Sequence, residues 1–201
     1  SKMYDLTGVS LHGRYKDVDI CIAHAFMPVV QAHIKADEDN IPFFWWEEMG
    51  WLTMCNGSVI DYGEPVKWFL KMKKLGFKIK WIGYDRRYSR EFVLKAKKAG
   101  FKVVDQPQRY VEKTEAFREV ERKYIEGKFY YCHNRAYEYC IENVKAIEDS
   151  DDFVRFEKIE PNLRIDLFDA DIIAAKQMLK DIEKAQNAEA WFGIGKENKD
   201  E

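Results

Sequence analysis

The chain has 201 residues, of which 46% are hydrophobic and 15% aromatic, so it can bury a core of its own and is most simply one domain. Its net charge of −2 neither favours nor excludes a nucleic-acid partner. No apolar stretch is long enough for a secretory or membrane segment, and the four cysteines form no C-x-x-C pair. We therefore expect reduced cysteines in a cytoplasmic compartment.

The first part of the chain predicts mainly strands. The predicted elements are a hairpin of residues 4–13 and 17–27, a short aromatic helix over 41–51, and an extended piece that ends near Ile60. The Asn56-Gly57 pair is a turn signal within that extended piece. The rings of the aromatic helix could stack on bases, but core or interface packing is the commoner role and the one we expect.

The pattern then alternates between helix and strand. The predicted elements are helices over 64–75 and 89–100, each ending at a glycine, strands over 77–85 and 101–106, helices capped by Thr114 and Asn134, and a last helix from 166 to about 187. An antiparallel meander followed by βαβ units predicts an RNase H-like mixed β-sheet with helices on both faces. We expect this α/β domain to cover residues 1–187 and a polar, mobile tail to cover 188–201.

Charge is unevenly distributed along the chain. Residues 67–102 carry thirteen Lys or Arg and two acids, a local balance of +11, which leaves the remainder near −13. The acids concentrate in segments such as 147–152 and 164–171. A basic region beside acidic clusters is expected of a protein that grips a polyanion and holds metal ions against it, although solvated helix faces give the same composition.

Asp85 ends a predicted buried strand directly before two arginines and a helix. Ligands bind at the carboxyl ends of parallel strands, so this position suits a functional acid. A helix N-cap or an ion pair with a neighbouring arginine explains it equally well without catalysis.

A second acidic pair lies far along the chain, at the start of the last helix. Asp166 and Asp169 are spaced i, i+3 and share one helix face. Together with a strand-end acid they could supply oxygen ligands to Mg²⁺ or Mn²⁺, whereas interaction with the helix dipole is the alternative explanation. Spacing alone does not separate these two interpretations.

Four segments taken together resemble the nuclease domain of tailed-phage large terminases. They are "IKWIGYDRRYSREFVLKAKKAGFKVVDQPQ", "FMP…IPFFWWEEMGWLTMCNGSVIDY", "TEAFREVERKYIEGKFYYCHN" and "RIDLFDADIIAA". The resemblance covers most of residues 5–180. Terminases of this kind join an amino-terminal ATPase motor to the nuclease, and the chain contains no G-x-x-x-x-G-K-[ST] loop, so we expect it to be the nuclease part alone.

The resemblance implies hydrolysis of duplex DNA with two divalent ions, Mg²⁺ or Mn²⁺. It assigns metal-binding and catalytic roles to Asp85 and Asp166, with Asp169 replacing or supplementing the latter. The basic residues expected to contact DNA phosphate are Arg86, Arg87, Arg90, Lys158 and Arg164. The implied partners are duplex DNA, the ATPase domain, the portal and the small terminase subunit, in the host cytoplasm, and we expect the isolated domain to be a monomer.

One position departs from the family pattern. The first strand of the family carries an acid in a pattern like G-[IV]-D-L, whereas this chain reads "GVSL" and places Ser10 there. A serine hydroxyl supplies no charge and is a poor Mg²⁺ ligand beside a carboxylate. Compensation by Asp5, Asp17 or Asp19 depends on strand register.

This departure sustains a rival hypothesis, a DNA-binding or docking domain of the packaging motor with little or no cleavage. A resolvase-like enzyme on the same fold is a third hypothesis, and it would require a preference for branched DNA. Only the nuclease hypotheses require a divalent metal.

Overall fold

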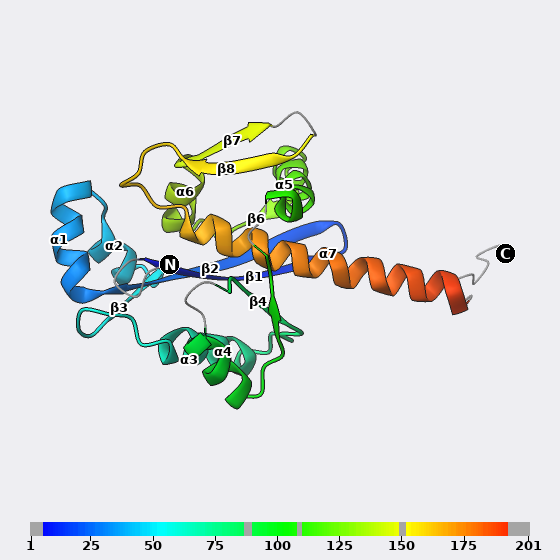
Figure 1. The fold of residues 1–201 in the computed structure, drawn as a ribbon, viewed down its shortest axis with the longest axis horizontal. Coiled ribbons are helices and arrows are strands. Elements are labelled where there is room, and N and C mark those ends of the chain that lie inside the picture. Colours follow the sequence, from blue (N-terminus) through cyan, green and yellow to red (C-terminus); the bar gives the residue numbers. More distant parts are fainter. Residues whose placement is uncertain (1–5, 87–89, 108–109, 149–151, 193–201) are drawn as a thin grey trace.

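The computed structural model describes residues 6–86, 90–107, 110–148 and 152–192 (Figure 1). The elements in chain order are β1 (Thr7–Tyr15), β2 (Val18–Pro28), α1 (Val29–Asp39), α2 (Phe43–Glu48), β3 (Leu52–Cys55), α3 (Gly63–Lys74), β4 (Ile82–Tyr84), α4 (Arg90–Lys98), β5 (Val103–Asp105), α5 (Tyr110–Ile125), β6 (Phe129–Tyr130), α6 (Arg135–Glu142), β7 (Val144–Glu148), β8 (Val154–Lys158) and α7 (Asp166–Phe192). None of the helices in this described part is both long enough and apolar enough to cross a membrane.

The central sheet is mixed. Strands β1 and β2 form the predicted antiparallel hairpin, with Thr7 opposite Phe26 and Tyr15 opposite Val18. Strand β3 runs parallel to the end of β2 and β6 runs parallel to its beginning. Two further pairs lie apart from this sheet, the parallel pair β4–β5 and the antiparallel pair β7–β8. The predicted α/β class with a mixed sheet is confirmed.

Each face of the sheet has its own apolar core. The side chains of β2 alternate, so that Cys21 and Ala23 pack into a cluster with α5, α6 and α7, while Phe26 packs into a second cluster with α3 and α4. Figure 1 shows α3 and α4 on one side of β1 and β2, and α5, α6 and α7 on the other. Helices on both faces were predicted, and this too is confirmed.

Some local predictions are correct because a single side chain decides them. Asn134 caps α6, since its side chain accepts a hydrogen bond from the Tyr137 backbone at 3.1 Å. Gly100 follows α4 with a φ of 84°, in the left-handed region where glycine is favoured. The aromatic helix is partly buried as expected, with Phe43 and Trp46 in the core.

Other predictions are wrong in ways that have a physical reason. Thr114 is not an N-cap, because α5 already begins at Tyr110 and the Thr114 hydroxyl instead accepts from the Val154 backbone of β8 at 2.9 Å. The strand expected over 77–85 is only the three residues of β4, which β5 alone pairs among the described residues. Helix α1 was not predicted, and α7 continues to Phe192.

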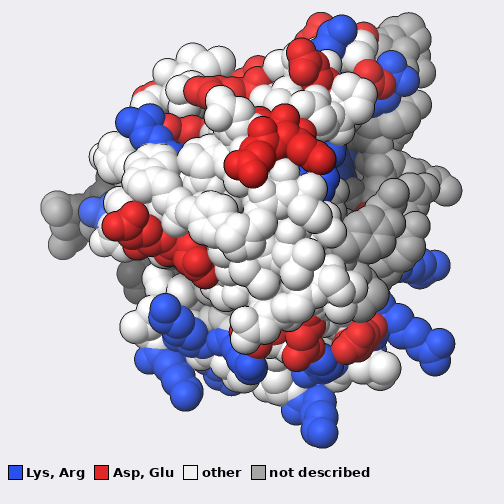
Figure 2. Space-filling model, turned by 90° about the vertical axis from the view of Figure 1, so that its left-hand side faces the viewer, with Lys and Arg blue, Asp and Glu red and all other residues white. Residues whose placement is uncertain are grey.

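The end of the molecule that carries α1 and α2 has an extensive surface without Lys or Arg at its centre (Figure 2). Its exposed apolar side chains are Val30, Ile34, Phe44, Trp45 and Met49. Acidic groups lie across this face, while Lys and Arg side chains gather along its lower edge, the edge on which α3 and α4 lie in Figure 1. The basic region of the sequence therefore forms a separate part of the surface.

Candidate active site

Asp85 follows β4 directly and is half-buried. Strand β4 lies close to α7 because Gly83 has no side chain: a Cβ at this position would be 2.7 Å from the Ile173 side chain. This contact brings the carboxyl end of β4 to the side of the helix that begins with the second acidic pair.

Asp166 is the first residue of α7, and Asp169 lies one turn further on. The helix start is held tightly against β1, since a Cβ at Gly8 would be only 2.4 Å from the Asp166 carbonyl oxygen. Both acids are half-buried. The close approach of the β1 and α7 backbones thus fixes the position of the first turn of α7, from which both carboxylates extend.

Asp85, Asp166, Asp169 and Ser10 line one groove of about 720 Å³ between β1, the 77–85 segment and α7. The acids come from elements that are about eighty residues apart in sequence. Apolar side chains such as Phe77, Ile79 and Trp81 form much of the remaining wall. The fold therefore brings the predicted site residues to the same cavity.

These carboxylates are not gathered into a ready metal site. Among the described residues, no three His, Cys, Asp or Glu side chains lie close enough to hold one ion. Asp169 forms an ion pair with Lys113 of α5, whose side chain is 8% exposed. The donor chemistry suits a hard divalent cation, but the arrangement does not present such an ion with a closed set of ligands.

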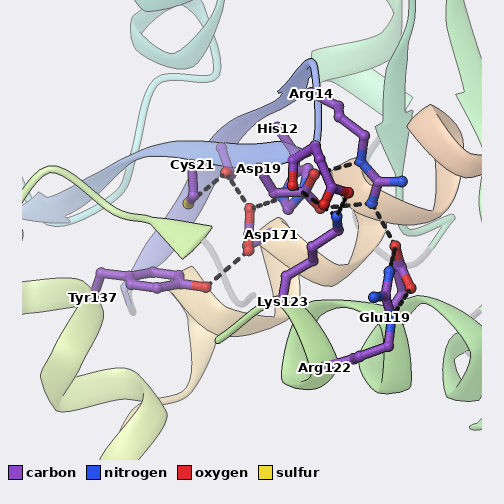
Figure 3. Close-up of polar contacts among 11 residues, drawn as sticks. His12, Arg14, Asp19, Cys21, Glu119, Arg122, Lys123, Tyr137 and Asp171 are labelled. Carbon is purple, nitrogen blue, oxygen red and sulfur yellow. Dashed lines mark hydrogen bonds and ion pairs between the residues drawn. The ribbon is translucent and has the colours of Figure 1, made fainter. Parts of the chain in front are cut away.

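Ser10 lines the groove, yet its hydroxyl points into the protein. It donates a 2.9 Å hydrogen bond to Asp171, a fully buried residue of α7, and lies 3.4 Å from the Cys21 sulfur. Figure 3 shows Asp171 at the centre of a set of polar contacts beneath β1. Ser10, which the resemblance assigns to the family's first acid position, is therefore already committed to Asp171.

His12 is the cation that balances this buried acid. Its Nδ1 lies 2.9 Å from Asp171 and its Nε2 lies 3.3 Å from Asp19 (Figure 3). Burial alone would lower the pKa of His12, but the two carboxylates outweigh it and raise the pKa to about 9. Both ring nitrogens consequently donate hydrogen bonds at neutral pH.

Asp171 is ionised for the reciprocal reason. Burial opposes its ionisation, but the His12 charge and hydrogen bond hold its pKa below the ordinary value. Tyr137 of α6 donates to the other Asp171 oxygen at 2.8 Å. Burial and the adjacent Asp171 charge raise the pKa of Tyr137 well above its usual range, so the hydroxyl remains a donor.

The network continues from Asp19 to the surface. Arg14 binds Asp19 through two nitrogens, at 2.5 and 2.9 Å, and reaches Glu119 of α5 at 2.6 Å. Burial opposes ionisation of Asp19, but Arg14 and His12 lower its pKa to about 2. This chain of charges fastens β1 and β2 to α5 and α7.

The acids considered as substitutes for the missing first-strand carboxylate are engaged elsewhere. Asp19 is buried between Arg14 and His12. Asp17 forms ion pairs with Lys123 and Lys128. Asp5 lies outside the described residues. Neither Asp17 nor Asp19 lines the groove.

The predicted phosphate contacts lie in different surroundings. Arg86 is 84% exposed and pairs with Asp105 at 2.5 Å, and Arg90 is exposed at the start of α4. Lys158 is half-buried at the end of β8. Arg87 lies outside the described residues.

Arg164 is not the exposed phosphate contact that the sequence predicts. Its side chain is 3% exposed, it donates to the Leu163 carbonyl at 3.2 Å, and it pairs with Asp39 at 3.5 Å. This buried guanidinium binds the backbone and the Asp39 carboxylate of the protein itself, so Arg164 is not placed to contact DNA.

Sequence reasoning missed Asp171, His12 and Tyr137. One signal was present: Asp171 stands in line with Leu167, Phe168 and Ala175 on the apolar face of α7, where an ionised acid needs a buried partner. The sequence does not identify that partner, because it comes from β1, far away in the chain.

Comparison with known proteins decides the family. The sequence profile described as "Terminase large subunit, endonuclease domain" matches residues 1–182. The chain belongs to this family. The crystal structure of the HK97 bacteriophage large terminase has a similar fold, with a TM-score of 0.78 and 20% sequence identity over 87% of this chain. The chain spans 37% of the length of that terminase. No curated protein matches the chain significantly.

Family membership confirms the resemblance noted in the sequence and, together with the HK97 likeness, the RNase H-like class of the fold. Nuclease domains of this kind generally use divalent metals.

Proposed function

We propose that this domain is a metal-dependent endonuclease that cleaves duplex DNA within a packaging terminase. The observation that carries the proposal is the groove lined by Asp85, Asp166 and Asp169, acids from two distant elements in a chain of the terminase endonuclease family. Divalent ions, Mg²⁺ or Mn²⁺, would supply charge neutralisation at the scissile phosphate and an activated water.

The residues of the chain would bind and orient the DNA. Arg86, directly after Asp85 in the chain, and Arg90, at the start of α4, are exposed and would contact phosphates, and exposed lysines of α4 would extend that contact. Asp85, Asp166 and Asp169 would hold the cations. The resemblance implies two ions. Ser10 brings no carboxylate, and the three acids are not gathered around one point among the described residues, so the two ions would share these three ligands.

The wider assignments follow from family membership. Duplex DNA would be the substrate, and an ATPase motor domain, a portal and a small terminase subunit would be the partners of the complete protein, in the host cytoplasm. We expect the isolated domain, residues 1–187 with its tail, to be monomeric.

A DNA-binding or docking domain with weak cleavage is the second candidate. The specific observation in its favour is Ser10, whose hydroxyl is committed to Asp171 at 2.9 Å. This function needs the basic surface but not the acids.

A plasmid-nicking assay separates the two candidates. Nicking by the unmodified chain with Mn²⁺ and none with EDTA, lost in Asp85→Asn and in Asp166→Asn, is the expected result. Asp37→Asn, at an exposed acid of α1, is the matched control and should leave nicking unchanged. DNA binding without nicking in Mn²⁺ would favour the docking function.

A further inference from the structure

Lys113 is a buried cation that faces the candidate site. It belongs to α5, its side chain is buried, and its ammonium forms an ion pair with Asp169 of α7. A lysine is rarely buried unless its charge is paired. Its partner is one of the three acids that line the groove, so this ion pair is a property of the site and not of a remote surface.

The position of Lys113 is fixed by its neighbour. The Thr114 hydroxyl accepts a 2.9 Å hydrogen bond from the Val154 backbone nitrogen, and this fastens the first part of α5 to β8. The lysine therefore projects from an anchored backbone. Its charge is held at a defined place, as a bound cation would be.

The charges of the predicted site residues explain why a lysine is useful there. Ser10 brings no charge, so the predicted site has three carboxylates, and Lys113 offsets the one on Asp169. Other charged residues that line the groove include Asp181, Arg14, Lys78 and Lys80. Within the part of the chain that the structure describes, the absence of a gathered three-ligand group is consistent with Asp169 being held by Lys113.

We propose that Lys113 is a built-in counter-cation of the site: its ammonium and a divalent cation compete for Asp169, so metal binding exchanges one for the other. Lys113 thus acts as a positioning residue through Asp169. This inference rests on the proposed function, since it requires Asp169 to belong to a metal site.

Competition for a shared carboxylate makes a quantitative prediction. Removing the ammonium in Lys113→Met should tighten Mn²⁺ binding by about tenfold, the size of an ordinary coupling between two sites. Isothermal titration of the full chain with Mn²⁺ alone measures this without DNA or cleavage. Lys180→Met, at an exposed lysine of α7, is the control and should leave affinity unchanged.

The pairing itself is tested by a double-mutant cycle. In an Asp169→Asn background the Lys113→Met change should no longer alter Mn²⁺ affinity, because the shared carboxylate is gone. Equal or weaker Mn²⁺ binding by Lys113→Met in the unmodified background overturns the proposal.

A second measurement uses the unmodified chain, in case Lys113→Met does not fold. The side-chain ammonium resonance of Lys113 should shift during a Mg²⁺ titration, whereas that of Lys123, which pairs with Asp17 away from the groove, should not. A Lys113 signal that stays unchanged at Mg²⁺ saturation overturns the exchange.

Mn²⁺ binding by the variants distinguishes a failure of the lysine exchange from a failure of the proposed metal-dependent function. If the unmodified chain binds Mn²⁺ and Asp85→Asn abolishes binding, while Lys113→Met has no effect, only the lysine exchange is wrong. Absence of Mn²⁺ binding in every variant overturns both.

Discussion

Two groups of acids lie near β1, and their surroundings differ. Asp171 and Asp19 are fully buried and surrounded by cationic and hydroxyl donors from β1 and α6. Asp166 and Asp169 are half-buried and line an open groove. Buried acids with a full set of donors hold elements together, whereas half-buried acids at the ends of elements remain accessible to a ligand. Helix α7 carries both kinds, Asp171 in the buried group and Asp166 and Asp169 at the groove.

The largest expected effect comes from removing the buried charge. Asp171→Asn should destabilise the fold by about 3–5 kcal/mol, because it leaves the His12 cation without its main partner. The matched change Asp166→Asn, at the half-buried first residue of the same helix, should cost no more than about 1 kcal/mol. Urea denaturation of both variants makes the comparison. Equal losses would show that the two groups of acids do not differ in role.

Ser10 belongs to both regions, and its replacement is the next largest effect. Ser10→Asp would bring a second carboxylate toward Asp171 at a position where the hydroxyl now lies 2.9 Å away. Without metal we expect a loss on the order of 3 kcal/mol, because two like charges meet in a buried place.

Mn²⁺ should recover much of that loss if the added carboxylate also reaches the groove. A cation that binds only the folded state adds about 2.7 kcal/mol at a hundredfold excess over Kd. Thermal melts of the unmodified chain and Ser10→Asp, each with and without Mn²⁺, measure this. The same response to Mn²⁺ in both proteins would mean that residue 10 does not contribute to the metal site.

The pH dependence of stability should reveal the buried network. His12 has a folded pKa raised to about 9, so its contribution is fully present below its unfolded pKa near 6.5 and is lost as pH rises through 9. Asp171 has a lowered folded pKa, and its contribution is lost only in acid. The titratable groups that face His12 are Asp171 and Asp19. Tyr137 donates to Asp171, and Arg14 donates to Asp19.

We therefore expect the unmodified chain to lose about 1–3 kcal/mol of stability between pH 6.5 and pH 9.5 through this residue. His12→Gln should start less stable and change less over the same interval. Denaturant titrations at three pH values measure both curves. Parallel curves would contradict the assignment of a charged His12.

The smallest expected effect concerns DNA. Arg90→Gln should lower the slope of log affinity against log salt by roughly one unit, because one phosphate contact is lost. Arg135→Gln, at an exposed arginine that begins α6 on the other side of the sheet, should leave the slope unchanged. Fluorescence anisotropy with a labelled duplex at several salt concentrations measures both slopes, and indistinguishable slopes would place the DNA elsewhere.

Local rules predicted what local contacts decide. The β1–β2 hairpin and the Asn134 cap depend on residues close in sequence, and both are confirmed. Thr114 carries the same capping signal, but a contact with β8, forty residues away, determines its role. No local pattern shows that β4 is so short, because strand length depends on which neighbour pairs with it.

In the candidate site, too, some residues are predictable from local patterns and others are not. Asp85, Asp166 and Asp169 are predicted from their positions at the ends of elements and from a family resemblance, and their metal-binding role stays a prediction. Their partner Lys113 and the buried acid Asp171 were not, since each pairing joins residues that are distant in sequence. A sequence identifies the acids more readily than it identifies the cations that hold them.

Helix α7 gives the molecule a distinctive motion in solution. Its 27 residues extend over about 40 Å, and Figure 1 shows the carboxyl-terminal half projecting beyond the body of the domain. A body with such a rod tumbles anisotropically. The N–H bonds of α7 lie along this long axis, so their ¹⁵N relaxation should report slower reorientation than that of the N–H bonds of β1.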